Sequence, residues 1–238
     1  METMPFMKIE QFRFSADNLG YLVFNDKTGM AIDGGAPGEI LAFAEDRGLT
    51  IAYVANTHQH HDHIHGNHAL LDKTGAAFID CATLGSDREI MLDNESVTLI
   101  PTPGHTTDSI TFLADDFMVT GDTLFNGTVG NCFSGDLEAF YRSLDRLISL
   151  PGRTKIYAGH DYVVESMQVA KKIEPDNPDI DAYMETYNPN LVVSTVADEL
   201  KVNPYIRFNA PEMVRHIEKN NMPAGTPLER FKALMELY

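Results

Sequence analysis

The sequence concentrates metal-binding side chain types in one short segment, residues 57–67, with the sequence T-H-Q-H-H-D-H-I-H-G-N. Five histidines and one aspartate lie between His58 and His65. Neutral imidazole is the commonest protein ligand for borderline divalent metals, and carboxylates often accompany it. A surface loop gains no stability from clustered imidazoles, so the segment predicts a metal centre.

Three later turns each offer one further metal ligand. They are P-G-H-T, T-G-D-T and A-G-H-D, which contain His105, Asp122 and His160. Each turn alone is weak evidence, but all three follow predicted strands. With the first segment they supply seven candidate ligands: His58, His60, Asp62, His63, His105, Asp122 and His160. Seven ligands are too many for one tetrahedral ion and suit two ions that share a bridging carboxylate.

The segments between these turns predict an α/β fold. Short apolar runs at 12–14, 21–24 and 30–32 predict an antiparallel meander. Longer patterns predict helices at 39–47, 64–71, 137–150 and 163–173, and strands at 51–55, 76–80, 96–101, 110–113, 117–120 and 155–158. A strand, a ligand-bearing turn and a helix hold a site at the carboxyl edge of a sheet. Two mixed halves predict two sheets packed face to face with helices outside, an αββα four-layer sandwich.

The sequence pattern changes after residue 173. A link rich in helix breakers, 174–179, is followed only by helical patterns at 180–186, 195–201, 211–219 and 228–237. Prolines stand at first-turn positions of the last two of these helices. We therefore expect a catalytic domain at 1–173 and a small helical C-terminal subdomain at 174–238, packed near the substrate site.

Composition limits the partners and the compartment. With 18 basic and 35 acidic residues, the formal charge of −17 argues against nucleic acid and anionic membranes. No run approaches the ~20 apolar residues of a membrane span, and the first seven residues predict no signal peptide. Cys81 and Cys132 match no disulfide or zinc-ribbon spacing. We expect a cytoplasmic protein with a small-molecule substrate; the oligomeric state is left open.

The motif H-x-H-x-D-H at 58–63, with G-H at 105, G-D at 122 and G-H at 160, resembles the metallo-β-lactamase superfamily. The motifs G-D-T-L-F at 121–125, G-H-D-Y at 159–162 and N-P-Y-I-R at 203–207 resemble its glyoxalase II (hydroxyacylglutathione hydrolase) branch, nearly end to end. The resemblance implies two divalent ions, zinc first, with iron or manganese as alternatives. It further implies that one ion is held by three histidines, His58, His60 and His105. The second ion would be held by Asp62, His63 and His160, and Asp122 would bridge the two.

The resemblance implies a hydrolase, most plausibly of a thioester, in which a metal-bridging hydroxide attacks the acyl carbon. Asp62 would be both a ligand and the proton acceptor. The sequence has no G-x-S-x-G elbow, which favours direct attack over a covalent intermediate. The alternatives are a mononuclear-iron persulfide dioxygenase, a lactonase or other ester hydrolase of the same superfamily, and a non-enzymatic metal-binding module.

The substrate half of the resemblance is incomplete. The glyoxalase II branch holds glutathione with a lysine and a tyrosine, where this chain has Asn131 and Phe133. The branch's C-terminal basic pair falls at 235–238, which contains no basic residue, and Tyr162 alone keeps a matching contact. Each lost charge-assisted hydrogen bond costs about 1.5–3 kcal/mol. The thiol carrier therefore need not be glutathione. The sequence assigns no role to three nearby residues: His61, His65 and Cys132.

Overall fold

The predicted N-terminal meander forms one half of the first sheet in the computed structural model, which describes residues 7–238. Its strands are β1 (Lys8–Phe14), β2 (Asn18–Phe24) and β3 (Thr28–Ile32). Strands β4 (Thr50–Ala55) and β5 (Ala77–Ile79) add parallel to β3, which gives the order β1-β2-β3-β4-β5. The prediction that the first seven residues form no signal peptide concerns a segment that lies almost entirely outside the described residues.

The second sheet has the order β11-β10-β9-β8-β7-β6. Its antiparallel part consists of β6 (Arg88–Leu92), β7 (Glu95–Pro101), β8 (Ile110–Ala114) and β9 (Phe117–Gly121). Strand β10 (Lys155–Ala158) lies parallel to β9, and β11 (Ser194–Thr195) pairs antiparallel with β10.

Two of these strands differ from the sequence prediction. Strand β6 was not predicted, because it is an edge strand with three of its five residues exposed and therefore has no continuous apolar run. The prediction that the tail forms only helices is wrong, because β11 comes from the tail. Two residues are too short to give a periodic signal, and Thr195 also caps the helix that follows.

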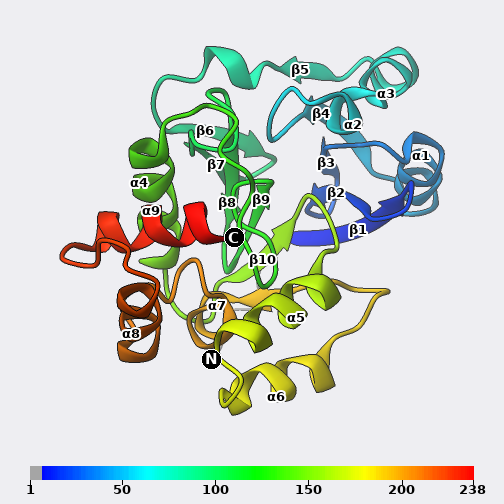
Figure 1. The fold of residues 1–238 in the computed structure, drawn as a ribbon. Coiled ribbons are helices and arrows are strands. Elements are labelled where there is room, and N and C mark those ends of the chain that lie inside the picture. The colour runs from blue at the N-terminus through cyan, green and yellow to red at the C-terminus, as the bar shows by residue number, and fades with distance from the viewer. Residues whose placement is uncertain (1–6) are drawn as a thin grey trace.

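Helices cover the outer faces of both sheets (Figure 1). Helices α1 (Pro37–Asp46) and α3 (Asn67–Thr74) pack on the first sheet through an apolar cluster that includes Ile40. Helix α4 (Leu137–Ile148) packs on the second sheet through a cluster that includes Phe140. A third cluster fills the space between the sheets. The predicted αββα four-layer sandwich is therefore confirmed.

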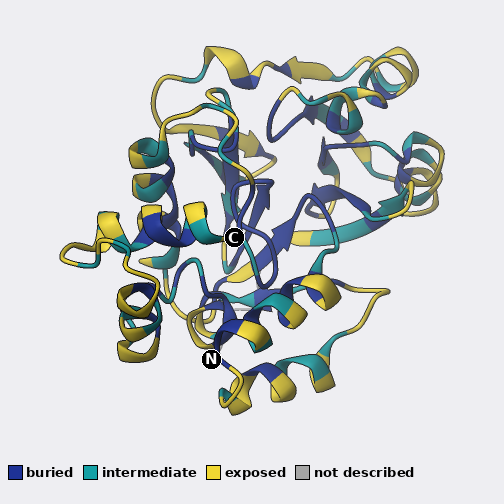
Figure 2. Cartoon of the chain, viewed as in Figure 1, coloured by how far each residue is buried: buried dark blue, intermediate teal, exposed yellow. Residues whose placement is uncertain are grey.

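Strand β2 illustrates why the two sheets stack. All seven of its residues are buried, because both faces of the strand are covered. Leu19, Tyr21 and Val23 belong to the cluster between the sheets, whereas Leu22 and Phe24 belong to the cluster under α1 and α3. Figure 2 shows the same pattern throughout, with buried strands inside and exposed helix surfaces outside.

The helix predicted to begin at residue 64 is two helices, α2 (His61–Ile64) and α3. The break includes Gly66, which packs against the backbone carbonyl of Gly34 so closely that any Cβ would collide with it. This contact pins the histidine-rich turn to the end of β3. The glycine therefore sets the position of α2, which carries Asp62 and His63.

The last elements are helices α5 (Val163–Ile173), α6 (Pro178–Thr186), α7 (Val196–Val202), α8 (Pro211–Lys219) and α9 (Pro227–Leu237). Helices α7 and α9 each begin with a capping box, which satisfies their first backbone N–H groups. Within residues 7–238 no helix is long and apolar enough to cross a membrane. The division at residue 173 and the cytoplasmic location stay predictions.

Two buried polar contacts hold the tail: one lies within it, and the other joins it to the rest of the chain. Arg207 donates to both carboxylate oxygens of Glu174, at 2.8 and 3.0 Å. Glu199 on α7 accepts from the backbone N–H of Gly127 at 2.8 Å and from Asn203 Nδ2 at 2.9 Å. Gly127 lies five residues after Asp122, so Glu199 anchors the segment that leads away from a predicted metal ligand. Arg207 thus ties the inner part of the tail to Glu174, the C-cap residue of α5.

We predict that Glu199 makes stability depend on pH. Burial raises its pKa from the ordinary 4.5 to about 7, although its hydrogen bonds oppose this. The folded chain therefore holds the proton to a higher pH than the unfolded chain, so Glu199 lowers the free energy of unfolding as pH rises from about 4.5 to about 7. The free energy of unfolding of Glu199→Gln minus that of the wild type should increase by about 3 kcal/mol as the pH rises across that window.

Urea unfolding at pH 5 and pH 8 measures this difference. Glu45→Gln, which changes an exposed glutamate on α1, is the matched control and should show no such gain. An equal response of the two variants to pH would contradict the assignment.

Candidate metal centre

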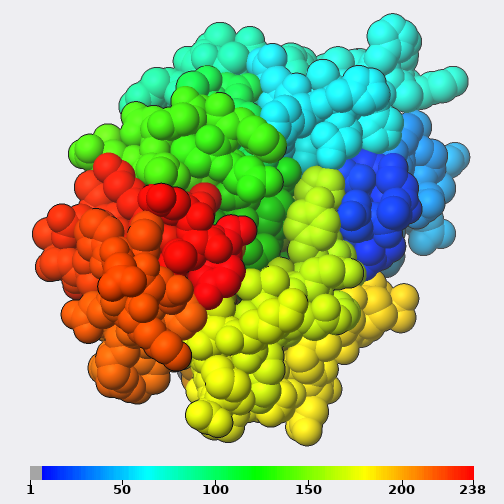
Figure 3. Space-filling model, viewed as in Figure 1, coloured from blue at the N-terminus to red at the C-terminus, as the bar shows by residue number. Residues whose placement is uncertain are grey.

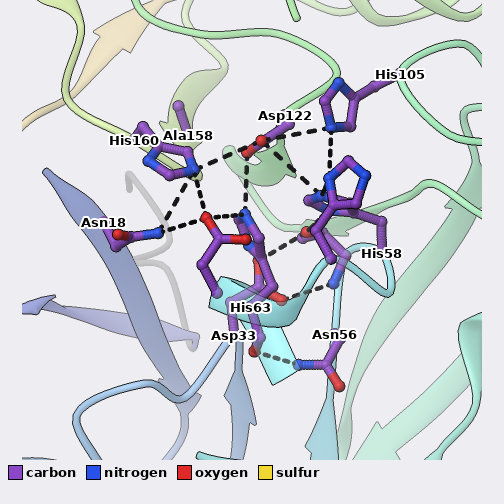
Figure 4. Close-up of polar contacts among 12 residues, drawn as sticks. Asn18, Asp33, Asn56, His58, His63, His105, Asp122, Ala158 and His160 are labelled. Atoms are coloured by element: carbon purple, nitrogen blue, oxygen red, sulfur yellow. Dashed lines mark hydrogen bonds and ion pairs between the residues drawn. The ribbon is translucent and has the colours of Figure 1, made fainter. Parts of the chain in front are cut away.

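The turns that carry the seven predicted ligands meet at one edge of the sandwich (Figure 4). Strands β4, β7, β9 and β10 end there, and α2 begins there. The carboxyl ends of adjacent parallel strands share one sheet edge, which brings residues distant in sequence together. The residues assembled are all seven that the sequence predicts: His58, His60, Asp62, His63, His105, Asp122 and His160.

The first group of donor atoms comes from His58, His60, His105 and Asp122, whose donors all lie within 4.8 Å of one another. His60 Nδ1 lies 2.9 Å from His58 Nε2 and 3.1 Å from His105 Nε2. Converging lone pairs on three ring nitrogens repel one another unless a cation or proton lies among them. The group therefore has the donor chemistry of a metal site.

The second group comes from Asp62, His63 and His160. Asp62 Oδ2 lies 3.3 Å from His160 Nε2 and 3.7 Å from His63 Nε2. Asn18 Nδ2 donates a hydrogen bond of 2.9 Å to the same carboxylate oxygen, which fixes its direction. One carboxylate with two imidazoles is a donor set that zinc, iron and manganese accept.

Asp122 connects the two groups. Its Oδ2 lies 3.5 Å from both His105 Nε2 and His160 Nε2, and its Oδ1 lies 3.4 Å from His63 Nε2. Although buried, Asp122 Oδ1 and His63 Nε2 have no hydrogen-bond partner within the described part of the chain. Buried polar atoms nearly always have partners, so these two fit a site that a cation completes.

Four of the five imidazoles form a hydrogen bond through Nδ1, on the side away from the cluster, at 2.9–3.3 Å. An acceptor at Nδ1 holds the ring proton there and leaves the Nε2 lone pair facing the cluster. His60 is the exception, because it presents Nδ1 itself. The four acceptors are the Thr57 hydroxyl for His58, Asp33 for His63, the Asn131 carbonyl for His105 and Asp17 for His160.

Asp33 is a functional candidate that the sequence analysis missed. Its fully buried carboxylate accepts from the Thr57 backbone N–H at 2.8 Å, from Thr57 Oγ1 at 2.7 Å and from His63 Nδ1 at 2.9 Å. Its φ of 51° is unusual for a residue other than glycine. The glycine- and proline-rich segment that follows, 34–38, is typical of an ordinary turn. The available signal was that an aspartate directly follows an apolar strand, as Asp122 nearly does.

The charges of the cluster favour a cation. Burial, with a smaller contribution from His63, lowers the pKa of His58 to about 3, so His58 is neutral and able to bind a metal. Burial also lowers the pKa of His63, but the carboxylates of Asp33 and Asp122 outweigh it and raise that pKa well above its ordinary value. The two buried carboxylates therefore require positive charge near His63, either a proton or a metal ion.

The three predicted substrate residues border the two groups. The Phe133 ring lies 5.6 Å from the His60 ring and 5.2 Å from the His105 ring, edge to face. Asn131 holds His105 through its backbone carbonyl, and the residue itself is exposed. The Tyr162 ring stacks on His160 at 5.1 Å. All three residues thus contact histidines of the two groups, and their role in substrate binding stays a prediction.

Three neighbouring residues lie outside both donor groups. His61 and His65 are exposed and stack on each other at 6.2 Å, on the solvent side of α2. Cys132 is half-buried between Asn131 and Phe133. The geometry therefore assigns none of the three to either group.

Comparisons with known proteins agree with this geometry. The family model described as metallo-beta-lactamase superfamily matches residues 18–82 and 79–160. The model described as hydroxyacylglutathione hydrolase C-terminus matches residues 161–237. The hydroxyacylglutathione hydrolases of Brucella ovis and Brucella suis are each 33% identical over 224 residues, which cover 85% of this chain and 87% of theirs.

Solved structures extend the likeness to three dimensions. The structure of ETHE1 from Myxococcus xanthus is similar with a TM-score of 0.70 at 25% identity, over 96% of this chain and 90% of that one. A metallo-beta-lactamase from Staphylococcus aureus has a TM-score of 0.66 at 20% identity, over 99% of this chain and 72% of that one, and shares the fold. The chain therefore belongs to the metallo-β-lactamase superfamily, in its glyoxalase II-like branch of metal-dependent hydrolases.

Proposed function

We propose that this protein is a binuclear metal-dependent hydrolase that acts on a thioester. The observation that carries the proposal is that two donor groups meet at one buried carboxylate, Asp122. A single ion would leave one of the groups without positive charge. The similarity to hydroxyacylglutathione hydrolases supports a thioester as the substrate.

The donor atoms divide between two ions. His58, His60 and His105 would hold one ion, Asp122 would bridge, and the second ion would rest on Asp62, His63 and His160. Zinc is the metal we expect first, with iron and manganese as alternatives, because histidine and carboxylate ligands suit all three. Two ions held by these residues would supply a nucleophilic water at neutral pH and would polarise the acyl carbonyl.

Asp62 is the residue we propose to direct the nucleophile. Burial raises its pKa, but His63 and the hydrogen bond from Asn18 outweigh this and lower it, so the carboxylate stays ionised. Asp62 is only half-buried and can therefore reach a water that Asp122 cannot. A carboxylate with a lowered pKa is a weak base. It can therefore orient a water molecule by accepting a hydrogen bond, but it does not readily become protonated.

The leaving group places few demands on the protein. A thiol has a pKa of about 8.5, so a thiolate departs near neutral pH with little assistance. Neither Phe133 nor the ionised Asp62 can act as a general acid, which suits a thioester better than an amide. Lactones and other esters remain alternative substrates, since the same nucleophile attacks them.

A mononuclear-iron persulfide dioxygenase is the second candidate. The likeness to ETHE1 at a TM-score of 0.70 is compatible with this alternative. Such an enzyme would bind one iron through two histidines and one aspartate, and the remaining donors would bind no metal. The metal content of the purified protein separates the two candidates.

We predict that the purified protein binds about two metal ions per chain. His160→Ala removes a donor from the second group only, so it should retain about one ion and lose at least 100-fold in kcat for a thioester. His68→Ala, which removes an exposed histidine from α3, is the matched control and should retain both ions.

Elemental analysis after exhaustive dialysis gives the stoichiometry. One equivalent of iron in the wild type, with oxygen uptake on a persulfide substrate, would favour the dioxygenase instead.

We also predict a supporting role for Asp33. In the wild type, one oxygen of Asp33 accepts from the Thr57 backbone N–H and the other accepts from His63 Nδ1. Asp33→Asn keeps only one oxygen, so it cannot serve both donors, and the His63 tautomer is no longer fixed. Metal affinity should fall about 10–100-fold, the usual cost of losing such a partner. Competition with a chromophoric chelator measures the affinity. Asp26→Asn, at a carboxylate 91% exposed, is the control, and equal affinities in both variants would refute the role.

A further inference from the structure

A cavity of about 590 Å³ opens beside the metal centre, between the segment 131–137 and helix α9. Asn131 and Phe133 belong to both features, since they line the cavity and touch the histidines of the first donor group. In Figure 3 the C-terminal helix, in red, lies against the green part of the chain. A substrate bound at the metal centre could extend into this cavity.

The walls of the cavity are largely apolar. Phe133 leaves 66% of its surface exposed, the largest value among the exposed large hydrophobic residues within 7–238. Leu137 and Met235 are half-buried and line the same cavity, beside the thiol of Cys132. An exposed aromatic ring against two imidazoles is apolar surface that a bound ligand can cover, and its burial contributes roughly 25 cal/mol per Å².

The charges of the cavity cancel. Its charged lining residues are Lys232 and Glu236, one turn apart on α9 and both exposed. Glutathione carries two carboxylates and one ammonium group. Lys232 could pair with one carboxylate and Glu236 with the ammonium, which leaves the second carboxylate without a partner. The exposed amide of Asn131 can both donate to and accept from a neutral amide. The lining therefore matches an uncharged arm that contains methylene and amide groups.

We propose that this cavity binds the thiol arm of the substrate and selects an uncharged, amide-containing arm over glutathione, which carries two carboxylates. This inference rests on the proposed thioester hydrolysis for its biological meaning. The binding preference itself depends only on the lining, so it can be measured without turnover. Phe133 covers the apolar part of the arm, and Asn131 and Met235 stand where an anionic arm would need cations.

Equilibrium binding to the metal-loaded protein tests the inference with two non-hydrolysable thioethers. S-hexylglutathione is the charged probe and N-acetyl-S-hexylcysteamine is the neutral one. We expect the neutral probe to bind at least tenfold more tightly. Phe133→Ala should weaken its binding about tenfold, by loss of apolar contact area. Phe78→Ala removes a phenyl group that is 48% exposed on β5 and should leave binding unchanged.

A gain-of-function variant tests the charge argument. Asn131→Lys combined with Met235→Arg should improve binding of S-hexylglutathione by about tenfold or more, because it adds two cations for two carboxylates. Met91→Arg adds one cation at a methionine 51% exposed on β6, and it should not improve binding. Tighter binding of the glutathione probe by the wild type, or no effect of Phe133→Ala on the neutral probe, would overturn the inference.

Turnover is measured separately with the lactoyl thioesters of the same two thiols. If neither thioester is hydrolysed while the neutral probe still binds more tightly, the proposed function fails and the cavity assignment stands. If both are hydrolysed but the glutathione probe binds more tightly, the hydrolase stands and the cavity assignment fails.

Discussion

The negative charge of Asp122 is the constraint on which the rest of the centre depends. Its carboxylate is buried and touches histidines of both donor groups, yet one of its oxygens has no hydrogen-bond partner within residues 7–238. An uncompensated buried carboxylate costs several kcal/mol. Asp33 adds a second buried carboxylate behind His63. The fold therefore holds more negative charge at this edge than its neutral imidazoles can balance, and divalent cations resolve that imbalance.

The sandwich explains how such a costly arrangement is held in place. Strands β4, β9 and β10 are fixed along their length by apolar clusters on both faces, so the turns that follow them have little freedom to separate. At the end of β10, Gly159 packs against Asp122 so closely that a Cβ would collide with its carboxylate. Burial of apolar side chains thus offsets the mutual repulsion of the converging donor atoms.

Much of this arrangement could be predicted from the sequence, because periodicity and turn residues report on strands covered on both faces. The seven donors could be found because each follows an apolar strand or belongs to the histidine turn. Asp17 and Asn18 could not, since aspartate and asparagine beside a turn usually cap backbone groups, and only the fold shows them beside His160 and Asp62. Asp33 does follow an apolar strand, but its contact with His63 is visible only in the fold. Edge strand β6 and the two-residue β11 lacked the apolar run that identifies a strand.

The chemistry and the choice of substrate depend on different parts of the chain. The donors sit on strand ends and on α2, where a shift of any one would disturb the others. The cavity beside them is lined by the segment 131–137 and by α9, and its residues at 131 and 133 are exposed. Substitutions there can alter the charge and polarity of the cavity without moving a donor atom. If the proposed thioester hydrolysis holds, a change of thiol carrier would require only a few residues of the cavity lining, whereas a change of reaction would require a different set of strand ends.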